Sequence, residues 1–273
     1  MALRVPQNKY SIDQGTRSII ALRCAVVTKA INDEFWNGST DLSHSFYVGS
    51  YGRHTAIDTS DVDILLKLPK GEYERFDSIK GNGQSRLLQG VKEAIKGVYS
   101  TSDIHADGQV VVIKFSDGIK FELLPAFEDT DYWGNGKGTY TYPDTNMGGN
   151  WRSTDPKAEI KAMVDKNNSS NGLFYDTCKH IRYIRDQYTS YHLSGIAIDT
   201  FVYNAMGNWR WTPPGGSSAP TGDYENTLMN AYNSASFNGI ISPSYVVPGS
   251  LMKLRFSDKD TETLGKILGK MVE

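Results

Sequence analysis

The chain has 273 residues, of which 39% are hydrophobic and 22% are charged, and its formal net charge is −2. This composition excludes a disordered chain, and the length is enough for one large domain or two lobes with a sizeable core. The near-neutral charge argues against wrapping of duplex DNA or adhesion to an anionic membrane. Binding of small anionic ligands is compatible with this charge, because it needs only a local basic cluster.

The first residues reach polar side chains too early for a signal peptide, and no apolar run approaches the roughly 20 residues of a membrane span. We therefore expect a cytoplasmic protein without a membrane partner. The cysteines, Cys24 and Cys178, show no zinc-site spacing. We expect both to be reduced and buried.

The N-terminal part predicts an α/β lobe. Residues 11 to 36 predict a long amphipathic helix, because one apolar stripe recurs at helical spacing: Ile20, Cys24, Val27, Ile31 and Phe35. Short apolar runs at 45–48 and 62–66 predict strands, and residues 84–98 predict a second helix. Residues 109–115 and 119–127 flank a Ser-Asp-Gly turn and predict a hairpin. The sheet is expected to be mostly antiparallel.

The C-terminal part predicts a mainly helical lobe. Residues 128–153 are rich in glycine and are expected to form a loop, followed by helices near 156–164, 173–188 and 194–206. We place the lobes at 1–150 and 151–273. The loop at 208–224 contains Trp209 and Trp211, which either form a lid or partner surface or simply pack onto the helical lobe.

A Gly-Ser turn precedes the second strand. Gly49 lets the backbone approach a ligand closely, Ser50 offers a hydroxyl, and Arg53 adds a positive charge nearby. Alone, this pattern is most often a plain surface turn. Its proximity to the acidic residues that follow indicates a phosphate-binding turn.

Acidic residues on the expected strands complete the pattern. Asp61 and Asp63 alternate with apolar residues, so both carboxylates point to one face of the strand. Hard oxygen ligands suit Mg²⁺ or Mn²⁺. A third carboxylate on a neighbouring strand would complete a two-metal site and accept a proton. Glu122 is the candidate, because it alternates with apolar residues and points to the other face of its strand. Glu128 and Asp129 compete for this role, but they lie past Pro125 and are expected off the strand.

These motifs resemble the DNA polymerase beta-type nucleotidyltransferases, and within them the bacterial cGAS/DncV-like nucleotidyltransferases of cyclic-oligonucleotide anti-phage defence (CBASS). The residues that carry the resemblance are Gly49-Ser50-Tyr51-Gly52-Arg53-x-Thr55, Ser60-Asp61-Val62-Asp63 and 121–127. Further likenesses at Asp107–Val111, Trp151–Glu159 and Ser194–Thr200 extend it over most of residues 45 to 205. The tail from Asn208 onward shows no clear match.

The resemblance implies an α+β fold, with a polymerase beta-like lobe, a helical C-terminal lobe and an active site in the cleft between them. It implies that Asp61 and Asp63 ligate Mg²⁺ and that Ser50 contacts a triphosphate. Basic residues on the helix at 173–188 and the serine opening the next helix would reach the donor phosphates. The matching residues are Lys179, Arg182 and Ser194, and the alternative for them is a solvated helix face and an N-cap.

The implied reaction converts nucleoside triphosphates, ATP or GTP, into a cyclic di- or trinucleotide and pyrophosphate, which a downstream effector senses. Many relatives carry aspartate where this chain has Glu122, whose longer side chain keeps the charge and the capacity to bind a metal ion. The chain lacks the Cys/His zinc insertion and basic surface of the animal cyclic GMP-AMP synthase, so no activation by duplex DNA is expected. The alternatives are a linear 2′–5′ oligoadenylate-like synthase, another template-independent transferase, a minimal transferase acting on a protein or small molecule, or a non-catalytic binding module.

Overall fold

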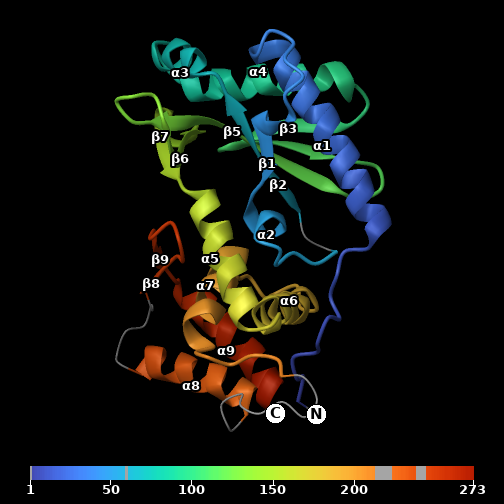
Figure 1. Cartoon of the computed structure of the whole chain (residues 1–273), viewed down its shortest axis with the longest axis vertical. Helices are drawn as coiled ribbons and strands as arrows, with labels where there is room; N and C mark the ends of the chain where they lie inside the picture. Colours follow the sequence, from blue (N-terminus) through green and yellow to red (C-terminus); the bar gives the residue numbers. More distant parts are fainter. Residues whose placement is uncertain (1, 59–60, 213–222, 238–243) are drawn as a thin grey trace. The chain divides into compact units, whose positions relative to one another are not determined.

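The computed structural model describes residues 2–58, 61–212, 223–237 and 244–273 (Figure 1). The chain forms two compact units, each assembled from separate segments. We call the unit of residues 13–52 and 61–157 the sheet unit, and the unit of residues 1–12, 53–60 and 158–273 the helical unit. The expected division at residue 150 therefore differs from the structure, because the first twelve residues and the segment 53–60 pack with the helical unit.

A mixed sheet forms the middle of the sheet unit. Its strands are β1 Ser45–Tyr47, β2 Val62–Leu68, β3 Asp103–Asp107, β4 Val110–Lys114, β5 Lys120–Thr130, β6 Gly136–Asp144 and β7 Asn150–Thr154. The order is β1-β2-β5-β4-β3, with β6 paired to β5 and β7 paired to β6. The β2 and β5 strands run parallel, and the other pairs are antiparallel. The sheet is thus mostly antiparallel, as expected.

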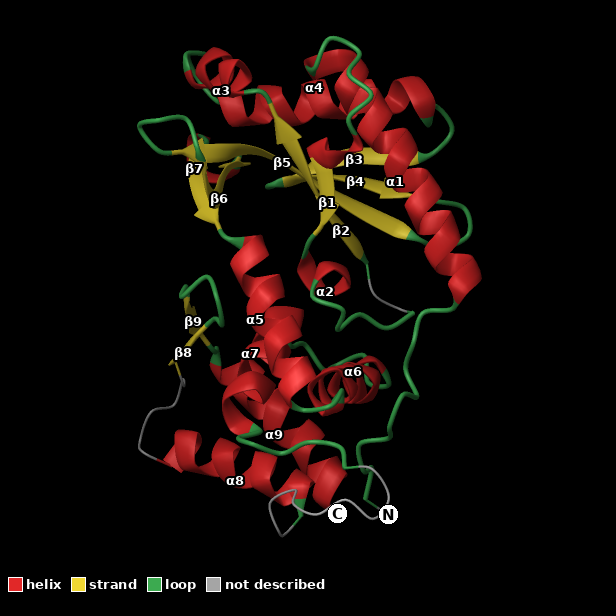
Figure 2. Cartoon of the chain, in the orientation of Figure 1, coloured by secondary structure: helices red, strands yellow, loops and turns green. Residues whose placement is uncertain are grey.

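Two long helices, α1 Gln14–Phe35 and α4 Gly83–Val98, cover one face of this sheet (Figure 2). The side chain of Asp13 caps α1 by accepting a hydrogen bond from Thr16 N. All five residues of the predicted apolar stripe are buried against the sheet. Shorter helices complete the unit: α2 Gly49–Gly52, α3 Lys70–Asp77 and the 3₁₀ turns Leu42–His44 and Asn146–Gly148.

The segment 128–153 is not the loop that its glycines suggest. The β5 strand continues to Thr130, and β6 and β7 form a meander after it. Pro125 does not end β5, because the pairing with β4 stops at Leu123 and the pairing with β6 starts at Phe127. The proline therefore lies where no antiparallel neighbour needs its missing N–H.

The helical unit contains α5 Pro156–Ser169, whose first two residues belong to the sheet unit, and further helices. These are α6 Leu173–Asp186, α7 Gly195–Ala205, α8 Tyr224–Phe237 and α9 Asp258–Val272, with a small ribbon of β8 Ser244–Val246 and β9 Lys253–Arg255. Apolar side chains of α6, α7 and α9 form its core. A capping box of Ser257 and Asp260 opens α9.

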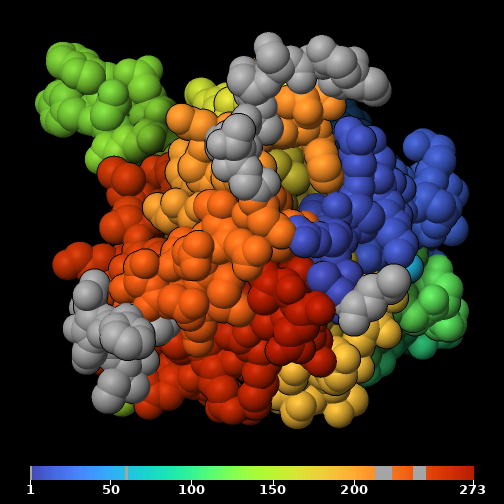
Figure 3. Space-filling model, turned by 90° about the horizontal axis from the view of Figure 1, so that it is seen from below, coloured from blue at the N-terminus to red at the C-terminus, as the bar shows by residue number. Residues whose placement is uncertain are grey.

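The N-terminal residues lie across this helical core, where Figure 3 shows them in blue beside the orange and red segments. The Leu3 N–H donates to Lys270 O over 2.8 Å, and the carbonyl of Leu3 lies 2.7 Å from Nε2 of His180. Arg4 forms ion pairs with Asp223 and Glu225. These contacts explain why the first residues belong to the helical unit although α1 belongs to the sheet unit.

Trp209 and Trp211 pack onto the helical unit, which is the second of the two alternatives for them. Both are half-buried against the helical core, and Trp211 Nε1 donates to Asp176 Oδ2 over 2.8 Å. Residues 213–222 of the expected 208–224 loop lie outside the described residues. In the described parts of the chain, no helix is both long and apolar enough to cross a bilayer. Cys24 and Cys178 are buried free thiols, as expected.

Candidate active site

The Gly-Ser turn forms the short helix α2, directly before which Val48 N donates to Asp63 O over 2.9 Å. Gly49 has a φ of +57°, and a Cβ added to it would lie 1.8 Å from Asp63 Oδ2. No side chain larger than hydrogen fits there. Gly49 thus brings the turn, including the half-buried Ser50, against the Asp63 carboxylate.

The register of β2 against β5 groups the carboxylates. Asp63 is the direct partner of Glu122, and Val62 is the partner of Phe121. Val62 and Phe121 are buried in the core under α1 and α4, so the alternating Asp61, Asp63 and Glu122 share the opposite face. Three carboxylates therefore lie on one face of two adjacent strands.

Lys120 lies among these acids. Its Nζ is 2.7 Å from Asp61 Oδ2 and 2.7 Å from Glu122 Oε1. Burial alone would lower the pKa of Lys120, but the hydrogen bonds to Asp61 and Glu122 raise it above its ordinary value. The lysine is therefore a protonated cation shared by two of the predicted metal ligands.

The fit of a divalent cation can be judged from this donor set. Among the residues that the structure describes, no three His, Cys, Asp or Glu side chains converge closely enough to hold a metal ion. Carboxylate oxygens are nevertheless the ligands that Mg²⁺ prefers, and Lys120 Nζ shows that Asp61 and Glu122 can share one positive charge. The side chains of Asp61, Asp63 and Glu122 thus fit such an ion in their chemistry and in their common face.

The competing acids serve another part of the sheet. Glu128 and Asp129 lie on β5, which corrects the expectation that they follow its end. Glu128 pairs with Lys67 at 3.4 Å, and Asp129 accepts hydrogen bonds from the hydroxyls of Thr139 and Thr141, both at 2.7 Å. Six residues of extended strand separate Glu128 from Glu122, a span of roughly 20 Å. They are therefore not part of the Asp61 and Asp63 group.

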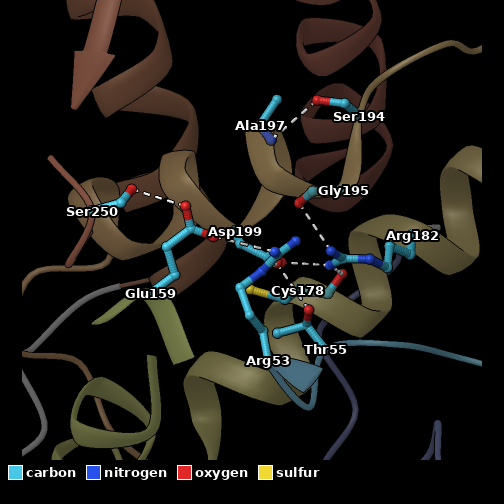
Figure 4. Close-up of polar contacts among 10 residues, drawn as sticks. All are labelled: Arg53, Thr55, Glu159, Cys178, Arg182, Ser194, Gly195, Ala197, Asp199 and Ser250. Atoms are coloured by element: carbon cyan, nitrogen blue, oxygen red, sulfur yellow. Dashed lines mark hydrogen bonds and ion pairs between the residues drawn. The ribbon is translucent and has the colours of Figure 1, made fainter. Parts of the chain in front are cut away.

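Two of the predicted phosphate contacts are buried in the helical unit, where both contact Asp199 (Figure 4). Arg53 and Arg182 are only 6% and 1% exposed. Arg53 Nε donates to Asp199 Oδ2 over 2.9 Å, and Arg182 Nη1 donates to Asp199 Oδ1 over 2.6 Å. Arg182 Nη2 also donates to Gly195 O over 2.9 Å. The guanidinium groups balance a buried carboxylate, and an uncompensated buried charge would be strongly unfavourable.

Asp199 is the residue that sequence reasoning left without a role. Its side chain is fully buried and also accepts from the Thr55 hydroxyl at 2.9 Å. Burial alone would raise the pKa of Asp199, but the charges of Arg182 and Arg53 hold it below its usual range. The signal was present in the sequence, because a lone acid among the apolar residues Ile198, Phe201 and Val202 requires a cationic partner.

The remaining predicted residues stay accessible in the helical unit. Ser194 is exposed and is the N-cap of α7, where its Oγ accepts from Ala197 N at 3.3 Å. Lys179 is half-buried, and its Nζ lies 5.9 Å from the ring centre of Tyr175. The Tyr175 ring also lies 5.9 Å from that of His54. The cap confirms one of the alternatives for Ser194, and its role toward phosphates stays a prediction.

The mixed sheet with a Gly-Ser turn beside an acidic strand pair, together with the helical unit, defines the polymerase beta-like nucleotidyltransferase fold. The chain belongs to the Second Messenger Oligonucleotide or Dinucleotide Synthetase (SMODS) family, whose sequence profile matches residues 7–167. Its fold is that of the bacterial cGAS/DncV-like members of this superfamily.

Individual relatives are distant in sequence. A probable cyclic nucleotide synthase of Bacillus cereus (strain VD146) is 24% identical over 150 residues, which are 50% of this chain and 44% of that protein. The chain therefore aligns with less than half of this curated relative.

Solved structures share the fold over nearly the whole chain. The CdnE cyclic dinucleotide synthase of Elizabethkingia meningoseptica, solved with GTP and Apcpp, is 19% identical with a TM-score of 0.62, covering 93% of this chain and 89% of that one. The DncV cyclic AMP-GMP synthase of Vibrio cholerae, solved with a linear intermediate, is 12% identical with a TM-score of 0.62, covering 95% and 84%. These likenesses extend to the C-terminal segment in which sequence motifs showed no clear match.

Proposed function

We propose that this protein is a cyclic oligonucleotide synthase, which makes a cyclic di- or trinucleotide from nucleoside triphosphates and releases pyrophosphate. The observation that carries the proposal is the register of Asp63 opposite Glu122, on the strand face that also bears Asp61 and beside the Gly49 turn. Membership of the SMODS family and the fold shared with cyclic dinucleotide synthases support the same class of reaction.

In this proposal, Asp61, Asp63 and Glu122 hold Mg²⁺, or Mn²⁺ in its place. The bound ion would neutralise charge on the donor triphosphate and on the attacking oxygen. The α2 turn with Ser50 faces the donor phosphates, and Gly49 keeps the Asp63 carboxylate next to them. Lys179 and Ser194 are the candidate phosphate contacts of the helical unit in this proposal, because Arg53 and Arg182 are buried and paired with Asp199.

A cyclic dinucleotide forms in two equivalent transfer steps, and a cyclic trinucleotide needs one more of the same kind. A ribose hydroxyl oxygen of the acceptor bonds to the α-phosphorus of the donor, the bond to pyrophosphate breaks, and Glu122 accepts the hydroxyl proton. The same chemistry on the linear intermediate would close the ring and release a second pyrophosphate. The protein would then act in anti-phage signalling, where an effector senses the product.

The test is a product analysis. The purified protein is incubated with the four ribonucleoside triphosphates and Mg²⁺ or Mn²⁺, and the products are treated with phosphatase. We expect phosphatase-resistant products, because a closed ring has no terminal phosphate. Products that all lose terminal phosphates to the phosphatase would contradict cyclisation and would favour the linear 2′–5′ oligoadenylate-like synthase.

The defence role is tested separately in cells. A strain expressing the protein with a candidate effector is challenged with phage, and the Asp63→Ala variant is the control. Protection that is lost with Asp63→Ala supports the signalling role, whereas equal protection by both proteins would contradict it.

A further inference from the structure

Lys120 forms ion pairs with two of the three carboxylates on the acidic face. It begins β5, and the register that pairs Val62 with Phe121 brings it opposite Asp61. Its Nζ makes two contacts of 2.7 Å, one to Asp61 and one to Glu122. Without this cation, the two carboxylates would lose the positive charge that lies between them, and like charges at that range repel.

A second lysine on the same strands shows how specific this arrangement is. Lys67 on β2 pairs with Glu128 on β5, and the side chains are 27% and 29% exposed. The side chains of Lys120 and Glu122 are 29% and 30% exposed, so the two pairs have nearly the same solvent access. Lys67 contacts one carboxylate at 3.4 Å, whereas Lys120 bridges two at 2.7 Å.

We infer that Lys120 is a built-in competitor of the divalent cation, which neutralises Asp61 and Glu122 in the resting protein and is released when the ion binds. The inference rests on the proposed function, since it assumes that these carboxylates are the metal ligands. Its physical basis is that an ammonium group and a divalent ion cannot both lie against the same oxygens, because their charges repel. Lys120 therefore sets the cation concentration at which the site fills.

The site with a bound ion and the site without one would then differ in the position of one side chain, that of Lys120. Lysine carries its charge on a flexible four-carbon stem, so Nζ can leave the carboxylates without a change in the strand backbone. Release exposes Nζ to solvent, while Lys67 stays paired with Glu128. Lys120 is thus a positioning residue that tunes the site, and no bond is made or broken at its nitrogen.

The inference is tested by metal binding in the absence of nucleotide. Mn²⁺ alone is titrated into the full-length protein, and free Mn²⁺ is measured by electron paramagnetic resonance. We expect Lys120→Met to bind Mn²⁺ about threefold to tenfold more tightly than wild type, since two surface ion pairs no longer oppose the metal. Lys120→Arg keeps the charge and should stay within about twofold of wild type.

Lys67→Met is the matched control, because it removes an equally exposed charge from the same two strands. Its Mn²⁺ affinity should stay within about twofold of wild type. Equal or weaker binding by Lys120→Met would overturn the inference, as would an equal gain in Lys67→Met, which would reveal a general charge effect.

A second experiment measures the release of the Lys120 side chain directly. An amine-acylating reagent is applied with and without Mn²⁺, and modification of Lys120 and Lys67 is quantified by mass spectrometry. We expect Mn²⁺ to accelerate modification of Lys120 and to leave Lys67 unchanged. Unchanged labelling of Lys120 when Mn²⁺ is bound would overturn the release. Absence of Mn²⁺ binding in all variants, or binding that survives Asp63→Asn, would instead contradict the metal site of the proposed function, and the inference with it.

Discussion

Arg182 and Asp199 form an ion pair that is sealed from solvent, with Nη1 2.6 Å from Oδ1 and side chains that are 1% and 0% exposed. Arg53 pairs with the other carboxylate oxygen at 2.9 Å. Arg53 follows Gly52, the last residue of α2, and begins the segment 53–60 of the helical unit. The ion pair attaches this segment to α7, which carries Asp199.

We predict that Asp199→Ala destabilises the protein by about 3 to 5 kcal/mol, because it takes the carboxylate from the buried Arg182 guanidinium and leaves Arg53 with Glu159 in place of two carboxylates. Chemical denaturation monitored by circular dichroism measures this loss. The control is Asp165→Ala, which removes the 60%-exposed partner of Lys161 and should cost at most about 0.5 kcal/mol. Similar losses in the two variants would show that burial does not increase the contribution of the Asp199 ion pairs to the free energy of unfolding.

Removal of a carboxylate from the acidic face should abolish turnover without unfolding the protein. For Asp61→Ala and Asp63→Ala we expect losses of about 1,000-fold or more, since each removes a proposed ligand of the ion that stabilises the transition state. Product formation is measured by chromatography, with the melting temperature as the test of folding. Asp103→Ala on β3 is the control, because this acid is exposed and pairs with His105 and Lys114. Full activity in both site variants would refute the assignment.

Gly49→Ala should impair activity through contact with Asp63 rather than through the turn alone. The new methyl carbon would lie 1.8 Å from the carboxylate, so the carboxylate must move. Gly38→Ala is the control, because Gly38 has a φ of +77° and nothing within 4 Å of an added Cβ. Both variants pay the strain of a left-handed residue, about 1 to 2 kcal/mol. We expect only Gly49→Ala to lose nucleotidyl transfer at a temperature where both are folded, and equal losses would point to strain alone.

Stability should fall at mildly acidic pH because of His180. Burial lowers the pKa of this ring, and its Nε2–H donates to the Leu3 carbonyl while Nδ1 faces the Tyr10 hydroxyl at 3.1 Å. The unfolded ring titrates near about 6.5. The contribution of His180 is therefore complete above about pH 6.5 and is lost as the pH falls through the lower folded value.

The measurement for His180 is the melting temperature at about pH 7.5 and about pH 5.5. His180→Gln should show a smaller decrease between the two conditions than wild type, because its side chain takes no proton. His105→Gln changes a half-buried histidine of β3, and its melting temperature should decrease between the two conditions as that of wild type does. An unchanged pH dependence in His180→Gln would show that other groups govern acid stability.

Much of the sheet unit was predictable because its signals are local. A helix stripe repeats every three to four residues and a strand alternates every second residue, so α1, α4 and the side-chain faces of β2 and β5 follow from sequence. The same alternation identified Asp61, Asp63 and Glu122 as a common acidic face. The β6 and β7 strands were missed because the glycines of residues 128–153 and Pro143 look like loop signals when the pairing partner is unknown.

The sequence by itself determined the residue types of the site: a glycine beside a serine, alternating carboxylates, and helices of the right length. Only the tertiary structure decided that Arg53 and Arg182 neutralise Asp199, that Lys120 lies between Asp61 and Glu122, and that the first residues pack with the helical unit. The physical reason is that the sequence shows directly which residues are charged. The partner of each charged residue, in contrast, is set by strand register and helix packing between residues far apart in the chain.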